Sequence, residues 1–160
     1  MRKMLNCLVL VCVITGCKGG STTPTDPNSK ATVAVDGQAF QPAAKGLIAI
    51  DSGSGGVTIL MSNCGTTTAS FAQVSFGLRS PLAVGIVPNA NIFQAMYFNS
   101  VGQWDWKAGQ GRGSLVLTSV SPRVVGTFEF DLQPGPGGPT GTKYINGSFD
   151  VSYGNGTACK

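Results

Sequence analysis

Strict alternation of apolar and polar residues near the carboxyl end is the feature that most limits what this chain can fold into. Between residues 127 and 132, Phe128, Phe130 and Leu132 alternate with polar residues. Residues 145–153 continue the pattern, with Asn, Ser or Asp at every even position. Because successive side chains of a β-strand point to opposite faces, each segment predicts a half-buried strand. The intervening PGPGGPTG excludes a helix, so the two strands are expected to form an antiparallel hairpin with a long loop.

Short apolar segments separated by Gly, Asn, Ser or Pro occupy the rest of the chain beyond residue 30. Asp36-Gly37, a pair that suits a tight hairpin turn, joins the apolar segments 32–35 and 38–40. Further strands are expected at residues 46–50, 57–61, 69–78, 92–98, 103–107 and 114–120. Only 92–98 could instead be a helical turn, and no segment has a long, capped helical period. The chain is therefore predicted to be all-β, a single antiparallel β-sandwich, with a partly open β-barrel as the alternative.

The amino terminus has the layout of a secretory signal. Arg2 and Lys3 precede an apolar run that ends near Ile14, too short to cross a hydrocarbon layer that needs about 20 residues. A charged start, a short apolar run and small residues before a break are typical of a cleaved signal peptide. The segment Ile14-Thr15-Gly16-Cys17 resembles the lipobox of bacterial lipoproteins, in which the cysteine carries the lipid. The alternative is an ordinary signal peptide with a chance cysteine.

The lipobox resemblance implies three parts: a signal peptide at 1–16, lipidated Cys17 with a flexible linker at 17–30, and a β-sandwich domain at 31–160. The linker has no large apolar side chain, so it cannot bury enough surface to become ordered. Two or three acyl chains would hold the protein on a membrane permanently. Lys18 stands where an Asp would resemble an inner-membrane retention signal, which favours the outer membrane. Acidic surface-export residues are missing from the next few positions, which favours the periplasmic side.

Both ends of the predicted domain resemble a group of small bacterial lipoproteins of uncharacterised function. The runs VVGTFEFDL and INGSFDVSY are similar to the last two strands of that group, and ATVAVDGQAFQP is similar to its first hairpin. Where the group usually has Trp after Asp-Gly, this chain has Ala39-Phe40. The resemblance implies an all-β fold and an envelope location, and it implies no activity.

Cysteine usage predicts one disulfide. Of five cysteines, Cys7 and Cys12 leave with the signal peptide and Cys17 takes the lipid, which leaves Cys64 and Cys159. An even pair in an oxidising compartment is expected to be bonded. A redox or metal-binding pair is the alternative, but the Cys-x-x-Cys spacing that it favours is missing. We therefore expect no metal site and no cofactor.

The chain offers little for catalysis. It has no histidine, which excludes Ser-His-Asp hydrolysis and histidine-ligated zinc. Glu129 and Asp131 lie two apart on one strand face and could act as a glycosidase-like pair, but solvated surface carboxylates are far commoner. No basic stripe with interleaved aromatic residues indicates nucleic-acid binding. We predict no catalytic residues, and a carboxylate-dependent hydrolase is the least favoured alternative.

The stretch MYFNSVGQWDW is the most suggestive binding feature. Trp104 and Trp106 should share one strand face, and with Tyr97 they could form a sugar-binding platform. A sandwich of this size needs large side chains inside, so the core is the favoured place for them. The predicted function is a lipid-anchored envelope protein with a structural or interaction role, whose partners are the membrane and another envelope protein or a polysaccharide. A carbohydrate-binding module is the alternative.

Overall fold

The computed structural model describes residues 26–51, 55–67, 69–154 and 159. Within them the chain forms strands and two 3₁₀ helices, η1 (Ala44–Gly46) and η2 (Asn89–Asn91), and no α-helix. None of the helical segments in these ranges has the length and apolar character of a membrane span. The predicted signal peptide, Cys17 and the linker up to residue 25 lie outside the described residues. The strands are β1 (Lys30–Val35), β2 (Gln38–Phe40), β3 (Leu47–Asp51), β4 (Gly56–Ser62), β5 (Ala72–Arg79), β6 (Gly85–Ile86), β7 (Ile92–Asn99), β8 (Gly102–Asp105), β9 (Gly113–Ser119), β10 (Arg123–Pro134) and β11 (Lys143–Ser152).

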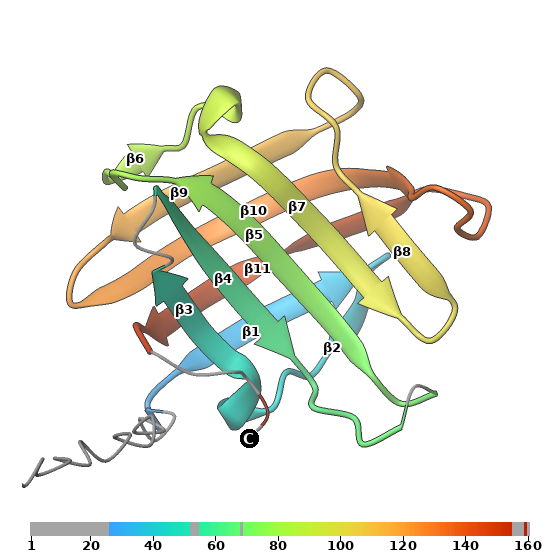
Figure 1. Ribbon diagram of the computed structural model, residues 1–160, viewed down its shortest axis with the longest axis horizontal. Coiled ribbons are helices and arrows are strands. Elements are labelled where there is room, and N and C mark those ends of the chain that lie inside the picture. The colour runs from blue at the N-terminus through green and yellow to red at the C-terminus, as the bar shows by residue number, and fades with distance from the viewer. Residues whose placement is uncertain (1–25, 52–54, 68, 155–158, 160) are drawn as a thin grey trace, which may run out of the picture.

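The strands form two layers that face each other (Figure 1). The back layer has the order β2, β1, β11, β10, β9 and β6, and the front layer has the order β8, β7, β5, β4 and β3. Neighbouring strands pair antiparallel, and the front strands run obliquely across the back strands (Figure 1). The predicted antiparallel β-sandwich is confirmed, and its sheet stays open instead of closing into a barrel.

Strand β10 connects the two layers. Most of its length pairs with β9 on one side and with β11 on the other, in the back layer. Its last two residues, Gln133 and Pro134, pair instead with Asp105 and Trp104 of β8 in the front layer. A strand that passes from one sheet to the other is typical of sandwiches whose layers cross at a large angle. The sequence predicts this strand only as far as residue 132, so it misses the part that joins the layers.

The core lies between the layers and is built from aromatic rings of both. Phe76 of β5 is completely buried. Its ring centroid lies 4.7 Å from that of Phe128, 5.4 Å from that of Phe130 and 6.4 Å from that of Phe149. These three rings come from the alternating strands β10 and β11, whose polar residues, such as Glu129, face outward. The alternation read from the sequence therefore assigns the inner and outer faces correctly.

Residues 26–30 pack against the ends of β10 and β11, although the sequence predicts a flexible linker through residue 30. Ser29 is buried, and its hydroxyl lies within hydrogen-bonding distance of a β11 serine. Asp26 forms an ion pair with Arg123, whose Nη2 also donates to the carbonyl oxygen of Asn28 at 3.2 Å. The hydrogen bond from the Asn28 backbone and the Arg123 guanidinium lower the pKa of Asp26. The folded domain thus begins before residue 31.

The remaining elements agree with the predicted strands, with one strand added. Asp36 and Gly37 have φ values of 51° and 77°, as a tight turn between β1 and β2 requires. Residues 92–98 are a strand and not a helical turn. The two-residue strand β6 was not expected, because its residues lie in a Pro-rich connection without alternation.

Candidate functional site

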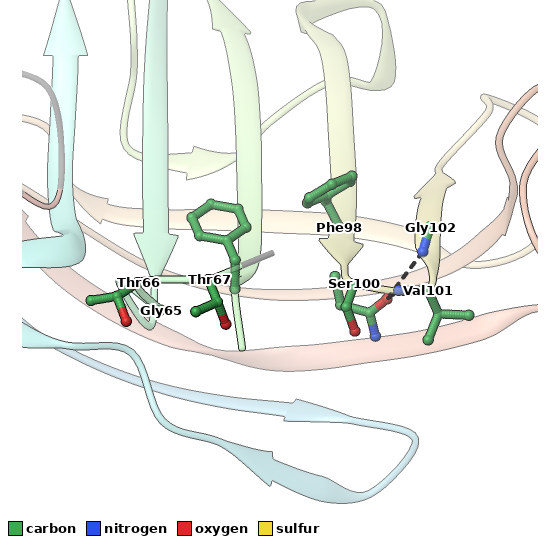
Figure 2. A pocket seen from close by; sticks show the side chains of 9 residues that line it. Gly65, Thr66, Thr67, Phe98, Ser100, Val101 and Gly102 are labelled. Atoms are coloured by element: carbon green, nitrogen blue, oxygen red, sulfur yellow. Dashed lines mark hydrogen bonds between the residues drawn. The ribbon is translucent and has the colours of Figure 1, made fainter. Parts of the chain in front are cut away.

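A cleft of about 470 Å³ opens at one end of the front layer, between the β4–β5 loop and the β7–β8 turn (Figure 2). We call it the end cleft. Phe71 and Phe98 form an apolar wall, with ring centroids 5.9 Å apart and planes tilted by 57°. Val101 stands at the rim and is 68% exposed. The cleft is lined by Gly65, Thr66, Thr67, Phe71, Phe98, Asn99, Ser100, Val101 and Gly102.

Asn63 organises the loop side of the end cleft. Its Oδ1 accepts hydrogen bonds from the backbone N–H groups of Gly65, at 3.1 Å, and Ala72, at 2.8 Å. Its Nδ2 donates to the carbonyl oxygen of Ser70 at 2.7 Å. An asparagine side chain that bonds neighbouring backbone groups in this way fixes a turn. The side chain of one residue thus holds both ends of the loop that carries Phe71.

Asn99 organises the turn side in the same manner. Its Oδ1 accepts from the N–H groups of Val101, at 2.9 Å, and Gly102, at 3.2 Å, and Figure 2 draws both bonds. Its Nδ2 donates to the hydroxyl of Tyr97 at 3.0 Å. Gly102 has φ of 158°, and a Cβ there would lie 2.4 Å from Cδ of Pro139. The turn that presents Val101 is therefore fixed from both sides.

The predicted disulfide between Cys64 and Cys159 is present, with their Cα atoms 5.2 Å apart. It lies beside the end cleft, because Cys64 precedes Gly65 in the loop. The backbone N–H of Cys159 also donates to the carbonyl oxygen of Lys45 at 2.9 Å. The covalent bond therefore fastens the cleft loop to the last part of the chain, next to η1.

The chemistry of the end cleft is that of a binding surface. Its nine lining residues carry apolar, hydroxyl or amide side chains, and none of these gains or loses a proton near neutral pH. The apolar wall can cover an apolar group of a ligand, and the hydroxyls of Thr66 and Ser100 can bond polar atoms beside it.

The three aromatic residues predicted as a sugar platform lie in the core. Trp104 and Trp106 are 3% and 8% exposed, and Tyr97 stacks on Trp104 with ring centroids 5.7 Å apart. The Nε1 of Trp104 donates to the carbonyl oxygen of Gly141 at 2.9 Å. The core interpretation is therefore confirmed and the platform interpretation is wrong for these residues. Their strand parity points them inward, and Phe98, in the next position after Tyr97, points outward into the cleft.

Glu129 and Asp131 face outward on β10, as predicted. Asp131 accepts hydrogen bonds from the side chain and the backbone N–H of Arg112, and these bonds lower the pKa of its carboxyl. Glu129 is exposed and accepts a hydrogen bond from the hydroxyl of Tyr144 at 3.3 Å. Asp131 is thus held in an ion pair with Arg112 on the outer face of β10.

Comparison with known protein families and with curated proteins gives no match. In the part of the chain that the structure describes, no group of three or more His, Cys, Asp or Glu side chains is placed to hold a metal ion. The protein is therefore described by its fold alone. It is an antiparallel β-sandwich with an uncharged cleft at one end. The stretch MYFNSVGQWDW supplies the turn side of the end cleft, but sequence reasoning did not select Phe71, Phe98 or Val101 as site residues.

Proposed function

We propose that the chain is a lipid-anchored protein of a bacterial cell envelope that binds another envelope protein through the end cleft and catalyses no reaction. In this proposal Cys17 carries the lipid, and the β-sandwich faces the periplasm from the outer membrane. The partner packs an apolar side chain against the wall that Phe71 and Phe98 form together, and its backbone bonds the hydroxyls at the rim.

The end cleft is the observation that carries this proposal. Aromatic side chains at the centre of a binding site contribute most when the surrounding frame is rigid, because little conformational entropy is then lost on binding. Asn63 and Asn99 fix the two sides of the cleft through backbone hydrogen bonds. The neutral lining supports binding in preference to acid–base chemistry.

The lipid anchor predicts that cells expressing the full chain and fed labelled palmitate incorporate the label into this protein. Replacing Cys17 with serine removes the thiol that takes the diacylglycerol, so labelling is expected to disappear and the protein to leave the membrane fraction. The measurement is autoradiography of the immunoprecipitated protein after cell fractionation. The Cys7→Ser variant is a matched control, because it changes a cysteine inside the predicted signal peptide. Labelling that persists in Cys17→Ser would refute the anchor.

If a partner occupies the end cleft, a crosslink is expected from position 98 of β7 and not from position 93 of the same strand. A photoreactive phenylalanine analogue at position 98 is expected to join the protein to one partner of defined mass in intact cells. Phe93 provides the matched control, because it is also an exposed phenylalanine of β7 but lies outside the end cleft. The Val101→Asp substitution puts a charge at the apolar rim and is expected to abolish the crosslink from position 98. Equal crosslinking from both positions, or none from either, would contradict a partner in this cleft.

A further inference from the structure

The outer face of the back layer carries a polar trough on the side of the molecule away from the front layer. Its floor has two rows in which hydroxyl, amide and carboxylate side chains lie side by side on three neighbouring antiparallel strands, and Val116 and Ala34 complete the rows. Thr32 is opposite Ser148, which is opposite Thr127, and the next outward row pairs Asn146 with Glu129 and Glu129 with Ser114. Neighbouring strands are about 4.8 Å apart, so adjacent polar groups in a row have roughly that spacing.

Two hollows, each of about 440 Å³, lie along this trough and share Thr127. One is lined by Thr32, Ser148 and Asp150 among others, and the second by Ser114, Glu129, Tyr144 and Asn146. Each hollow falls in the size range of small-ligand sites.

Ion pairs hold the two arginines at the ends of the trough, and Lys30 is a further cation that lines the first hollow. The Arg112 guanidinium lies 4.4 Å from the ring centroid of Tyr144 and forms an ion pair with Asp131. At the other end Arg123 pairs with Asp150. An anion in the hollow around Glu129 would therefore have to displace Asp131 to reach Arg112, and it would meet Glu129 itself, whereas Lys30 lines only the other hollow.

The floor keeps hydrogen-bonding groups free for a ligand. Among the described residues, the hydroxyls of Ser114 and Thr127 and the amide of Asn146 form no hydrogen bond with the protein. The carboxylate of Glu129 accepts one, from Tyr144. These hydroxyl and amide groups can both donate and accept hydrogen bonds, and the Glu129 carboxylate can accept them from O–H groups. An apolar ligand would leave all of these groups unpaired, at a cost for each one that it buries.

We propose that this trough binds an oligosaccharide without net charge. Its hydroxyl groups donate to Glu129 and accept from Asn146 and Ser114, which matches the mixed character of the floor. Tyr144 lines the same hollow, with the Arg112 guanidinium over one face of its ring and its hydroxyl bonded to Glu129. This site is separate from the end cleft, since the two share no lining residue, and neither hollow is lined by Tyr97, Trp104 or Trp106.

The test is binding of the full chain to an array of neutral and N-acetylated oligosaccharides, in a detergent without a sugar headgroup. At least one oligosaccharide is expected to bind, and its affinity is then measured by calorimetric titration. Glu129→Gln and Asn146→Ala each remove groups that face the ligand, and each is expected to weaken binding about tenfold or more. Thr127→Val is expected to weaken it, whereas Thr58→Val, the same change on the outer face of the front layer, should leave the affinity unchanged.

A second measurement makes the result independent of variant folding. On titration of the unmodified protein with the bound sugar, the backbone amide NMR signals of Tyr144 and Asn146 should shift most, and that of Val101 in the end cleft should not. Absence of binding to every oligosaccharide, undiminished affinity in Glu129→Gln and Asn146→Ala, or shifts concentrated at Val101 would each overturn the proposal. Such a result would leave the crosslinking test of the end cleft untouched.

Discussion

Replacing Phe76 with alanine is expected to lower the free energy of unfolding by about 3 to 5 kcal/mol. Phe76 is completely buried, and its ring approaches Phe128, Phe130 and Phe149 from the opposite layer. Truncation removes the group through which β5 contacts both central strands of the back layer, and it leaves a cavity that a packed β-sandwich fills only in part. The measurement is equilibrium unfolding in guanidinium chloride, followed by tryptophan fluorescence.

Phe93→Ala is the matched control, because it deletes the same atoms from a side chain that is 54% exposed. Its expected cost is about 1 kcal/mol or less. The Phe93 ring covers Gly77, whose hypothetical Cβ would lie 2.3 Å from Cε2 of that ring, so some packing is lost. If both variants lose the same small amount of stability, the core does not depend on contacts between the layers.

The strand positions could be predicted because alternation is a local property. In β10 and β11 apolar and polar residues alternate, so the sequence assigns each residue to the inner or the outer face. The two strands are consecutive in the chain, so the sequence also predicts that they pair as a hairpin. The passage of β10 into the front layer at Gln133 and Pro134 could not be predicted, because it depends on where β8 lies. Pro134 also does not indicate a strand, because proline has no backbone N–H to donate to a neighbouring strand and occurs only at sheet edges and strand ends.

The end cleft could not be predicted, because its residues come from two connections far apart in the sequence. Phe71 and Phe98 are single aromatic residues at the ends of strands, and only folding brings their rings to 5.9 Å. The sequence analysis considered Trp104 and Trp106 as a possible sugar-binding platform because their indole rings are large. Strand parity would have found the outward residue, because Tyr97 and Phe98 are adjacent and only one of them can face the core.

Replacing both Cys64 and Cys159 with serine is expected to lower the free energy of unfolding by about 4 to 5 kcal/mol, the largest single loss expected outside the core. The bond closes a loop between residues 95 apart in the sequence, and its removal restores that chain entropy to the unfolded state. Unfolding of the unmodified protein in guanidinium chloride, with and without a reducing agent, gives the same comparison without mutation. Reduced and oxidised protein with equal midpoints would contradict this expectation.

The same substitution should also weaken binding at the end cleft more than its effect on global stability explains. Cys64 lies between Asn63, which organises the cleft loop, and Gly65, which lines the cleft. Without the bond, what remains between the described residues Cys159 and Lys45 is their backbone hydrogen bond. The loop is then expected to open locally, and its backbone amides near Thr66 should exchange with solvent faster than those of β5 under native conditions. Exchange that rises equally in the cleft loop and in β5 would show that the disulfide stabilises the whole fold and does not hold the cleft in shape.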